Sequence, residues 1–192
     1  MKIYLASQSP RRQDLLKQMG VEFQVLPIDI LETTLPHESS MDYSKRITHE
    51  KLVAARQFID EHELPKRPIL CADTEVVMSG KIYGKPKDAL DAFQMLKSYS
   101  LQKHQVMTSV GIHFLDIEKI EIDVTDVYFS ELTNDVIENY LAMNQYQDKA
   151  GAYGIQGYMG QYIEKIEGSF YAVMGLPIHR VRRLLDNLDG TQ

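Results

Sequence analysis

The stretch from Leu5 to Arg12 reads LASQSPRR, and the interpretation of the whole chain starts from it. Residues Lys2–Ala6 predict a short strand, and the polar residues that follow predict a turn. Ser9 is a favourable residue for the cap of a helix, and Pro10 is favourable at its first position. The sequence therefore predicts a strand that leads through a polar turn into a helix, whose free N–H groups attract phosphate.

Side chains that donate hydrogen bonds gather at this helix start. Ser7 and Ser9 supply hydroxyl groups, and Arg11 and Arg12 supply guanidinium groups that bind phosphate oxygens in pairs. Arginines in a first helical turn oppose the helix dipole, which counts against a role as idle surface residues. We expect these four side chains to bind an anion. A plain helix cap with solvated arginines is the alternative.

Strands and helices are interspersed along the rest of the sequence. Apolar runs and alternation predict strands at 23–26, 69–72 with 75–78 as a continuation, 106–115, 120–129 and 161–166. Helical periodicity predicts helices that start at Pro10 and that cover 44–61, 88–97, 134–143 and 177–188. This order predicts an α/β fold with a mixed sheet.

Composition excludes several classes of protein. The 192 residues fit one domain or two small lobes. With 21 Lys and Arg against 27 Asp and Glu, the net charge of −6 argues against binding to nucleic acid or an anionic membrane. No stretch approaches the roughly 20 apolar residues of a membrane span, and the apolar part of the N-terminus is too short for a signal peptide.

The single cysteine, Cys71, excludes an internal disulfide and favours a cytoplasmic location. Because it lies in an apolar run, it predicts a packed thiol rather than a nucleophile. One cysteine and six scattered histidines do not make a zinc site.

Two charged residues stand in apolar surroundings. Asp73 closes the predicted strand 69–72, and α/β folds usually carry their chemistry at strand ends. A buried carboxylate there needs a metal or a cation, whereas the start of a surface turn is the alternative. Lys51 lies in an apolar helical stripe, which is unusual for a lysine unless its ammonium reaches a partner. Snorkelling along the surface is the more common explanation.

Two glycine-containing segments carry the remaining candidate functional residues. Gly84-Lys85-Pro86 predicts a rigid turn, on which Lys85 would ordinarily be solvated. Residues 148–157 read DKAGAYGIQG, and three glycines in seven residues indicate a backbone that bends or approaches something closely. Gln156 can donate and accept hydrogen bonds there. An ordinary loop is the alternative.

The P-loop and Rossmann glycine patterns are absent from the sequence. The cations that fall in or beside the segments described so far are Arg11, Arg12, Lys51, Lys85 and Lys149. If these segments converge, the cations form a positive cleft suited to a polyphosphate.

A series of short motifs follows in order along the chain: SQSPRR at 7–12, Glu32-Thr33, Glu50-Lys51, Ala72-Asp73-Thr74, Gly84-Lys85-Pro86, HQVMT at 104–108, residues 148–157 and Gly168-Ser169. In this order they resemble the Maf nucleotide pyrophosphatases, which share an architecture with the inosine triphosphate pyrophosphatases. The resemblance implies a single domain over residues 1–192, with an elongated mixed sheet flanked by helices and two lobes around a central cleft. It also implies a homodimer.

The resemblance further implies an activity. Residues 148–157 are similar to the branch that acts on dTTP and UTP, or on modified pyrimidine nucleotides, and yields the monophosphate and pyrophosphate. It implies that Asp73 is the catalytic carboxylate and that Asp73 and Glu32 hold Mg²⁺ or Mn²⁺. It implies that Glu32, Lys51, Lys85 and Arg12 line the phosphate site. The residues implied in the choice of base are Arg11, Thr74 and Gln156.

The chain departs from the family pattern at three places. Tyr99-Ser100-Leu101 replaces a Leu-Ser-Gly turn, Leu52 replaces an alanine, and Glu75 replaces an apolar residue. An extra carboxylate beside Asp73 could change metal binding.

Two other functions stay open. One is a nonenzymatic nucleotide-binding regulator of cell division, although binding alone would not require Asp73 and Glu32. The other is a related pyrophosphatase that acts on purine nucleotides or 7-methyl-GTP.

Overall fold

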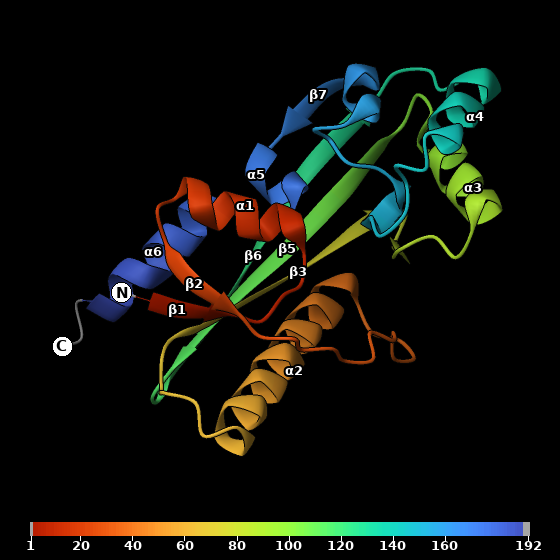
Figure 1. Ribbon diagram of the computed structural model, residues 1–192. Helices are drawn as coiled ribbons and strands as arrows, with labels where there is room; N and C mark the ends of the chain where they lie inside the picture. Colours follow the sequence, from red (N-terminus) through yellow and green to blue (C-terminus); the bar gives the residue numbers. More distant parts are fainter. Residues whose placement is uncertain (1, 190–192) are drawn as a thin grey trace. The chain divides into compact units, whose positions relative to one another are not determined.

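A computed structural model describes residues 2–189 and shows strands and helices mixed along the chain (Figure 1). The strands are β1 (Lys2–Leu5), β2 (Glu22–Val25), β3 (Ile69–Met78), β4 (Lys81–Tyr83), β5 (Lys103–Phe114), β6 (Ile117–Phe129) and β7 (Ile163–Glu167). The helices are α1 (Pro10–Gln18), α2 (Ser40–Glu61), α3 (Ala89–Tyr99), α4 (Asn134–Ala142), α5 (Phe170–Met174) and α6 (Ile178–Asp189), with short 3₁₀ helices η1 (Ala150–Ala152) and η2 (Tyr158–Tyr162).

The strands form a seven-stranded mixed sheet in the order β2-β1-β3-β5-β6-β7, with β4 paired to β3. The predicted α/β class and the mixed sheet are therefore confirmed. The chain divides into two compact units. Among the described residues, unit 1 comprises 2–73, 108–122 and 175–189, and unit 2 comprises 74–107 and 123–174.

In unit 1, apolar side chains cover both faces of the strands. Tyr4 on β1 and Cys71 on β3 pack against Leu52 and Ala55 of α2. Leu5 alternates to the opposite face, where it is also fully buried, and Figure 1 shows α1 and α6 on that side. Covered faces are what parallel strands require, and β1 pairs parallel with both β2 and β3.

The helix starts show what capping contributes. Helix α2 begins four residues earlier than predicted, because the Ser39 hydroxyl accepts a hydrogen bond from the Asp42 N–H and so extends the first turn. Helix α1 begins at Pro10 as predicted, but the Ser9 side chain makes no capping hydrogen bond. The prediction of Ser9 as a cap is therefore right in position and wrong in its side-chain contact.

Strand β3 differs from its prediction at one point. The sequence predicted a strand at 69–72, closed by Asp73, with 75–78 as a continuation; the continuation is confirmed, but β3 is one unbroken strand of ten residues. Antiparallel pairing of Val76, Val77 and Met78 with β4 carries the strand onward. Asp73 is thus a mid-strand residue, 7% exposed, and both the strand-end and the surface-turn interpretations are wrong.

In unit 2, helices α3 and α4 pack side by side (Figure 1). Leu96 of α3, Ile137 of α4 and Phe129 of β6 belong to one buried cluster. Tyr99 and Tyr153 also belong to this cluster, so the glycine-rich segment that carries Tyr153 is anchored in the core of the unit.

Two exclusions made from the sequence can be checked in the structure. Cys71 is buried, and burial raises the pKa of its thiol to about 12, so it is a packed thiol as predicted. Within residues 2–189, no helix has both the length and the apolar character needed to cross a membrane.

We predict that Gly111→Ala destabilises unit 1. A Cβ at Gly111 on β5 would lie 2.7 Å from Thr48 Cγ2 and 3.0 Å from Leu52 Cδ1, both on α2. The helix must then move from the sheet, at a cost of about 1–3 kcal/mol in the free energy of unfolding. Urea denaturation measures this difference. Gly84→Ala is the control, because its Cβ would meet nothing within 4 Å. Equal stability of the two variants would contradict the prediction.

Candidate active site

In unit 1, polar side chains gather just past the carboxyl ends of β1 and β2. Leu5, the last residue of β1, pairs with Leu70, and β3 continues beyond it. Asp73 lies three residues past Leu70, where β1 no longer runs beside it. Ser7, two residues past Leu5, is also buried. Asp73 therefore lies in the middle of its own strand, but beyond the point where the neighbouring parallel strand β1 ends.

The Lys51 ammonium is held between two carboxylates. Lys51 Nζ lies 2.7 Å from Asp73 Oδ1 and 2.6 Å from Glu32 Oε1. The Lys51 side chain is 12% exposed and that of Asp73 is 10% exposed, whereas that of Glu32 is 40% exposed. The apolar stripe thus carries a lysine that reaches a partner, and the snorkelling explanation is wrong.

Opposing effects act on the pKa of Lys51. Burial lowers it, as does the nearby charge of Arg12, but the carboxylates Asp73 and Glu32 outweigh both and leave the pKa above its usual value. Lys51 is therefore a fixed positive charge at neutral pH.

Arg12 is fixed beside this group by two oxygens. Its Nη1 donates to the Ser7 hydroxyl at 3.0 Å, and its Nε donates to the Gly175 carbonyl at 2.8 Å. The Ser9 backbone N–H also donates to the Ser7 hydroxyl, at 3.3 Å. The anchoring role of Gly175 was not predicted, because a carbonyl contact across 163 residues depends on no particular side chain.

Glu32 and Asp73 are the carboxylates of this group that could hold a divalent metal. Oxygens of Glu32 and Asp73 converge on one cation, the Lys51 ammonium. Mg²⁺ is usually held by one or two carboxylates together with phosphates of the substrate. Among residues 2–189, no group of three or more His, Cys, Asp or Glu could hold a metal ion. The pair therefore suits an ion that shares its ligands with a phosphate rather than a metal enclosed by protein.

In unit 2, a close backbone contact joins the Lys85 turn to the glycine-rich segment. The Gly151 N–H donates to the Gly84 carbonyl at 3.0 Å. Gly151 has a φ of +67°, and a Cβ there would lie 2.9 Å from Val76 Cβ and 3.1 Å from the Tyr99 hydroxyl. Only glycine fits this conformation and this gap. The predicted close approach of the backbone is confirmed, and it is an approach to β3 and to the turn before Lys85.

The other candidate residues of unit 2 occupy different environments. Lys85 and Gln156 are exposed, whereas Thr74, next to Asp73 on β3, is half-buried. A Cβ on Gly154 would lie 3.3 Å from Gln156 Oε1, so the amide folds over the glycine. Lys149 donates to the backbone carbonyl of Gln145 and stabilises the turn that leads into the segment.

His104 contacts the glycine-rich segment through the side chain of Tyr153. Its Nε2 lies 2.7 Å from the Tyr153 hydroxyl, and the histidine is 1% exposed. Burial lowers the pKa of His104 to about 4, against a smaller opposing effect of Asp126. The imidazole is therefore neutral at pH 7 and serves as a hydrogen-bond partner rather than as a charge.

This environment predicts how stability depends on pH. Between pH 6.5 and 4 the unfolded chain binds a proton at His104 and the folded chain does not, so stability falls as the pH falls. Over this range the wild type should lose about 3 kcal/mol more than His104→Asn. Below about pH 4 the difference stops growing. Urea denaturation across this range measures it.

Tyr153→Phe is the matched control for this prediction. It removes the hydrogen bond but leaves His104 buried, so it should keep the pH dependence of the wild type. Equal slopes for the wild type and His104→Asn would show that His104 is protonated in the folded protein.

Comparisons with known proteins agree with this architecture. The chain is 44% identical to a protein of Chromobacterium violaceum and 43% identical to one of Photobacterium profundum, both named dTTP/UTP pyrophosphatase. The matches cover 96% and 97% of this chain and 93% and 96% of the relatives. A protein of the same name from Escherichia coli is 44% identical, over 98% of this chain and 93% of that protein.

A solved structure shares the fold. The Ham1 protein of Staphylococcus aureus matches with a TM-score of 0.52 at 11% identity, over 97% of this chain and 99% of that one. At this identity the likeness concerns the fold alone. Residues 2–188 match the family described as Maf-like protein. The chain therefore belongs to the Maf family.

Proposed function

We propose that this chain is a nucleoside triphosphate pyrophosphatase that hydrolyses dTTP and UTP to the monophosphate and pyrophosphate. The relatives that cover nearly the whole chain carry this activity in their names. The observation that carries the proposal is the Glu32–Lys51–Asp73 group, because two carboxylates around a fixed ammonium suit a metal-bound phosphate better than a simple protein surface.

In this proposal the residues of unit 1 carry the chemistry. Glu32 and Asp73 would hold Mg²⁺ or Mn²⁺, which when bound polarises phosphate oxygens. Asp73, oriented by the Lys51 ammonium, would accept a hydrogen bond from the attacking water. Arg12 is locked by Ser7 and Gly175, so its charge is in place before the pyrophosphate leaves. Ser9 and Arg11, at the start of α1, complete the proposed anion site.

Unit 2 would contribute a phosphate contact and the choice of base. Lys85 would neutralise charge on the departing pyrophosphate, on a turn fixed by the Gly151 contact. Thr74 and Gln156 would take part in the choice of base, because a glutamine amide both donates and accepts. We also propose a homodimer, on the family resemblance, and a cytoplasmic location, on the single buried cysteine.

The first experiment removes the proposed catalytic carboxylate. Asp73→Asn should lower the turnover of dTTP with Mn²⁺ by about 10²–10⁴-fold, because a neutral amide neither holds a metal nor accepts a proton. Pyrophosphate release measures turnover. Asp116→Asn, an exposed aspartate, is the control and should retain activity. Glu32→Gln should also lose activity. Because the Glu32 side chain is half-exposed, this variant should fold normally. Near-normal turnover by Asp73→Asn would remove Asp73 from the mechanism.

A substrate panel separates the three candidate functions. We expect dTTP and UTP to be hydrolysed fastest among dTTP, UTP, CTP, ITP and 7-methyl-GTP. Faster hydrolysis of ITP or 7-methyl-GTP would assign the chain to a related pyrophosphatase. Nucleotide binding without pyrophosphate release would favour a nonenzymatic regulator.

The Gly151 contact gives a further prediction. Gly151→Ala should lower kcat/KM for dTTP by about 10–100-fold, because the added methyl group separates the Lys85 turn from the glycine-rich segment. Gly20→Ala is the matched control: Gly20 has a similar φ of +70°, and a Cβ there would meet nothing within 4 Å. It should lose a little stability and keep its kcat/KM. Equal losses of activity in both variants would contradict the positioning role.

A further inference from the structure

Unit 1 contains a cavity of about 150 Å³ whose rim is strongly basic. Arg56 of α2, Lys66 and Arg67 before β3, and His113 near the end of β5 line it. Asp60 is the one acidic residue of the lining. In a chain with a net charge of −6, this local excess of positive charge is unusual.

Three of the basic side chains at this cavity form no close ion pair in the described part of the chain. Within residues 2–189, no carboxylate lies within 4 Å of the charged nitrogens of Arg56, Lys66 or Arg67. Arg67 instead stacks on the Tyr4 ring, with its Cζ 5.4 Å from the ring centre. His113 Nδ1 is buried and lies 3.6 Å from Glu118 Oε2. Positive charges gathered in this way repel one another, and a bound anion would relieve that repulsion.

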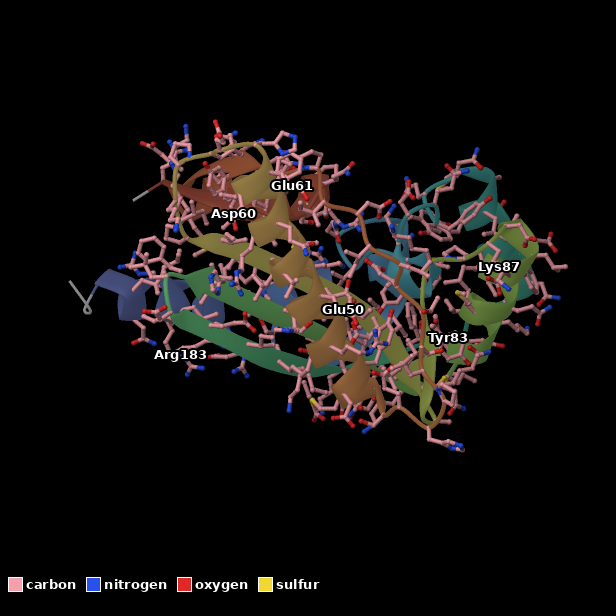
Figure 2. The ribbon with its side chains drawn as sticks, turned by 90° about the horizontal axis from the view of Figure 1, so that it is seen from below. Glu50, Asp60, Glu61, Tyr83, Lys87 and Arg183 are labelled. Carbon is pink, nitrogen blue, oxygen red and sulfur yellow. The ribbon has the colours of Figure 1, made fainter. Side chains whose placement is uncertain are left out.

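The cavity is separate from the Glu32–Lys51–Asp73 group. Ile69, the first residue of β3, lines the cavity, and Asp73 is four residues further along the strand, about 13 Å at 3.3 Å per residue. Figure 2 shows the same separation along α2, where Asp60 lies at the end of the helix and Glu50, next to Lys51, lies near its middle.

Size limits the ligand. A volume of about 150 Å³ holds roughly ten water molecules, at about 15 Å³ of such volume each. It is smaller than the roughly 300–1,000 Å³ of pockets that enclose drug-sized molecules, so a whole nucleotide does not fit inside. A compact oxyanion does fit, and arginine pairs its N–H groups with such oxygens.

We propose that this cavity binds a compact phosphate anion, inorganic phosphate or pyrophosphate, at a site separate from the proposed catalytic group. Arg56 and Lys66 would bind its oxygens, and the His113 ring, which also lines the cavity, would lie close to it. The choice of pyrophosphate as one source rests on the proposed function, which releases it. The site itself follows from the cavity and its charges.

The test follows the C2 proton of His113 by ¹H NMR during pH titrations of the whole chain. In the free protein, burial and the Arg56 guanidinium lower the pKa of His113, while Glu118 and Asp116 oppose them. A phosphate bound within a few ångströms should raise that pKa by about one unit. His113→Gln identifies the resonance. Sodium phosphate, sodium pyrophosphate and sodium chloride are compared at equal ionic strength.

We expect phosphate and pyrophosphate to raise the pKa of His113, pyrophosphate at the lower concentration, while chloride does not. The double variant Arg56→Gln/Lys66→Gln should lose the shift, and Lys45→Gln, an exposed cation earlier on α2, should keep it. Both replaced residues are exposed, so the double variant should fold and keep its turnover of dTTP. No shift in the wild type, a shift equal to that of chloride, or an undiminished shift in the double variant would overturn the proposal. Because no hydrolysis is measured in the titration, this failure is distinct from failure of the proposed function.

Discussion

The Lys51 ammonium is the constraint on which unit 1 depends. An ammonium taken from water without a partner costs several kcal/mol, and Lys51 is largely buried. Its partners come from two other parts of the chain: Asp73 from β3 and Glu32 from the segment after β2. Helix α2, strand β3 and that segment must therefore keep one relative position, or a buried charge is left alone. The apolar contacts of Leu52 and Ala55 with β1 and β3 supply that position.

Stability alone does not account for this ion group. Replacement of buried ion pairs by well-packed apolar residues is often neutral or stabilising. A lysine and an aspartate on facing elements could thus give way to apolar residues at no cost to the fold. Their presence agrees with the proposed chemistry, since the Lys51 ammonium brings two carboxylates together, and proteins commonly give up stability at functional sites.

Local patterns in the sequence predicted much of this arrangement. The fold class, the start of α1, the buried thiol of Cys71 and the unusual stripe position of Lys51 all depend on residues close in sequence. The place of Asp73 was predicted wrongly, because a break in an apolar run does not reveal where the neighbouring strands stop. The partner of Lys51 and the anchor of Arg12 at Gly175 depend on contacts between distant segments, and those contacts are set by tertiary packing.

The two units position their candidate residues by different physics. In unit 1 the charges of the Glu32–Lys51–Asp73 group attract one another over several ångströms. This group therefore tolerates small shifts of the helix and strand that carry Lys51 and Asp73. In unit 2 the Lys85 turn is placed by the contact of Gly151 with Val76 and Tyr99, where an added methyl group has no room. Packing forces change within half an ångström, so this contact transmits small displacements directly. The sequence predicted a close approach at the glycines, but only the packed core shows that the approach fixes the turn before Lys85.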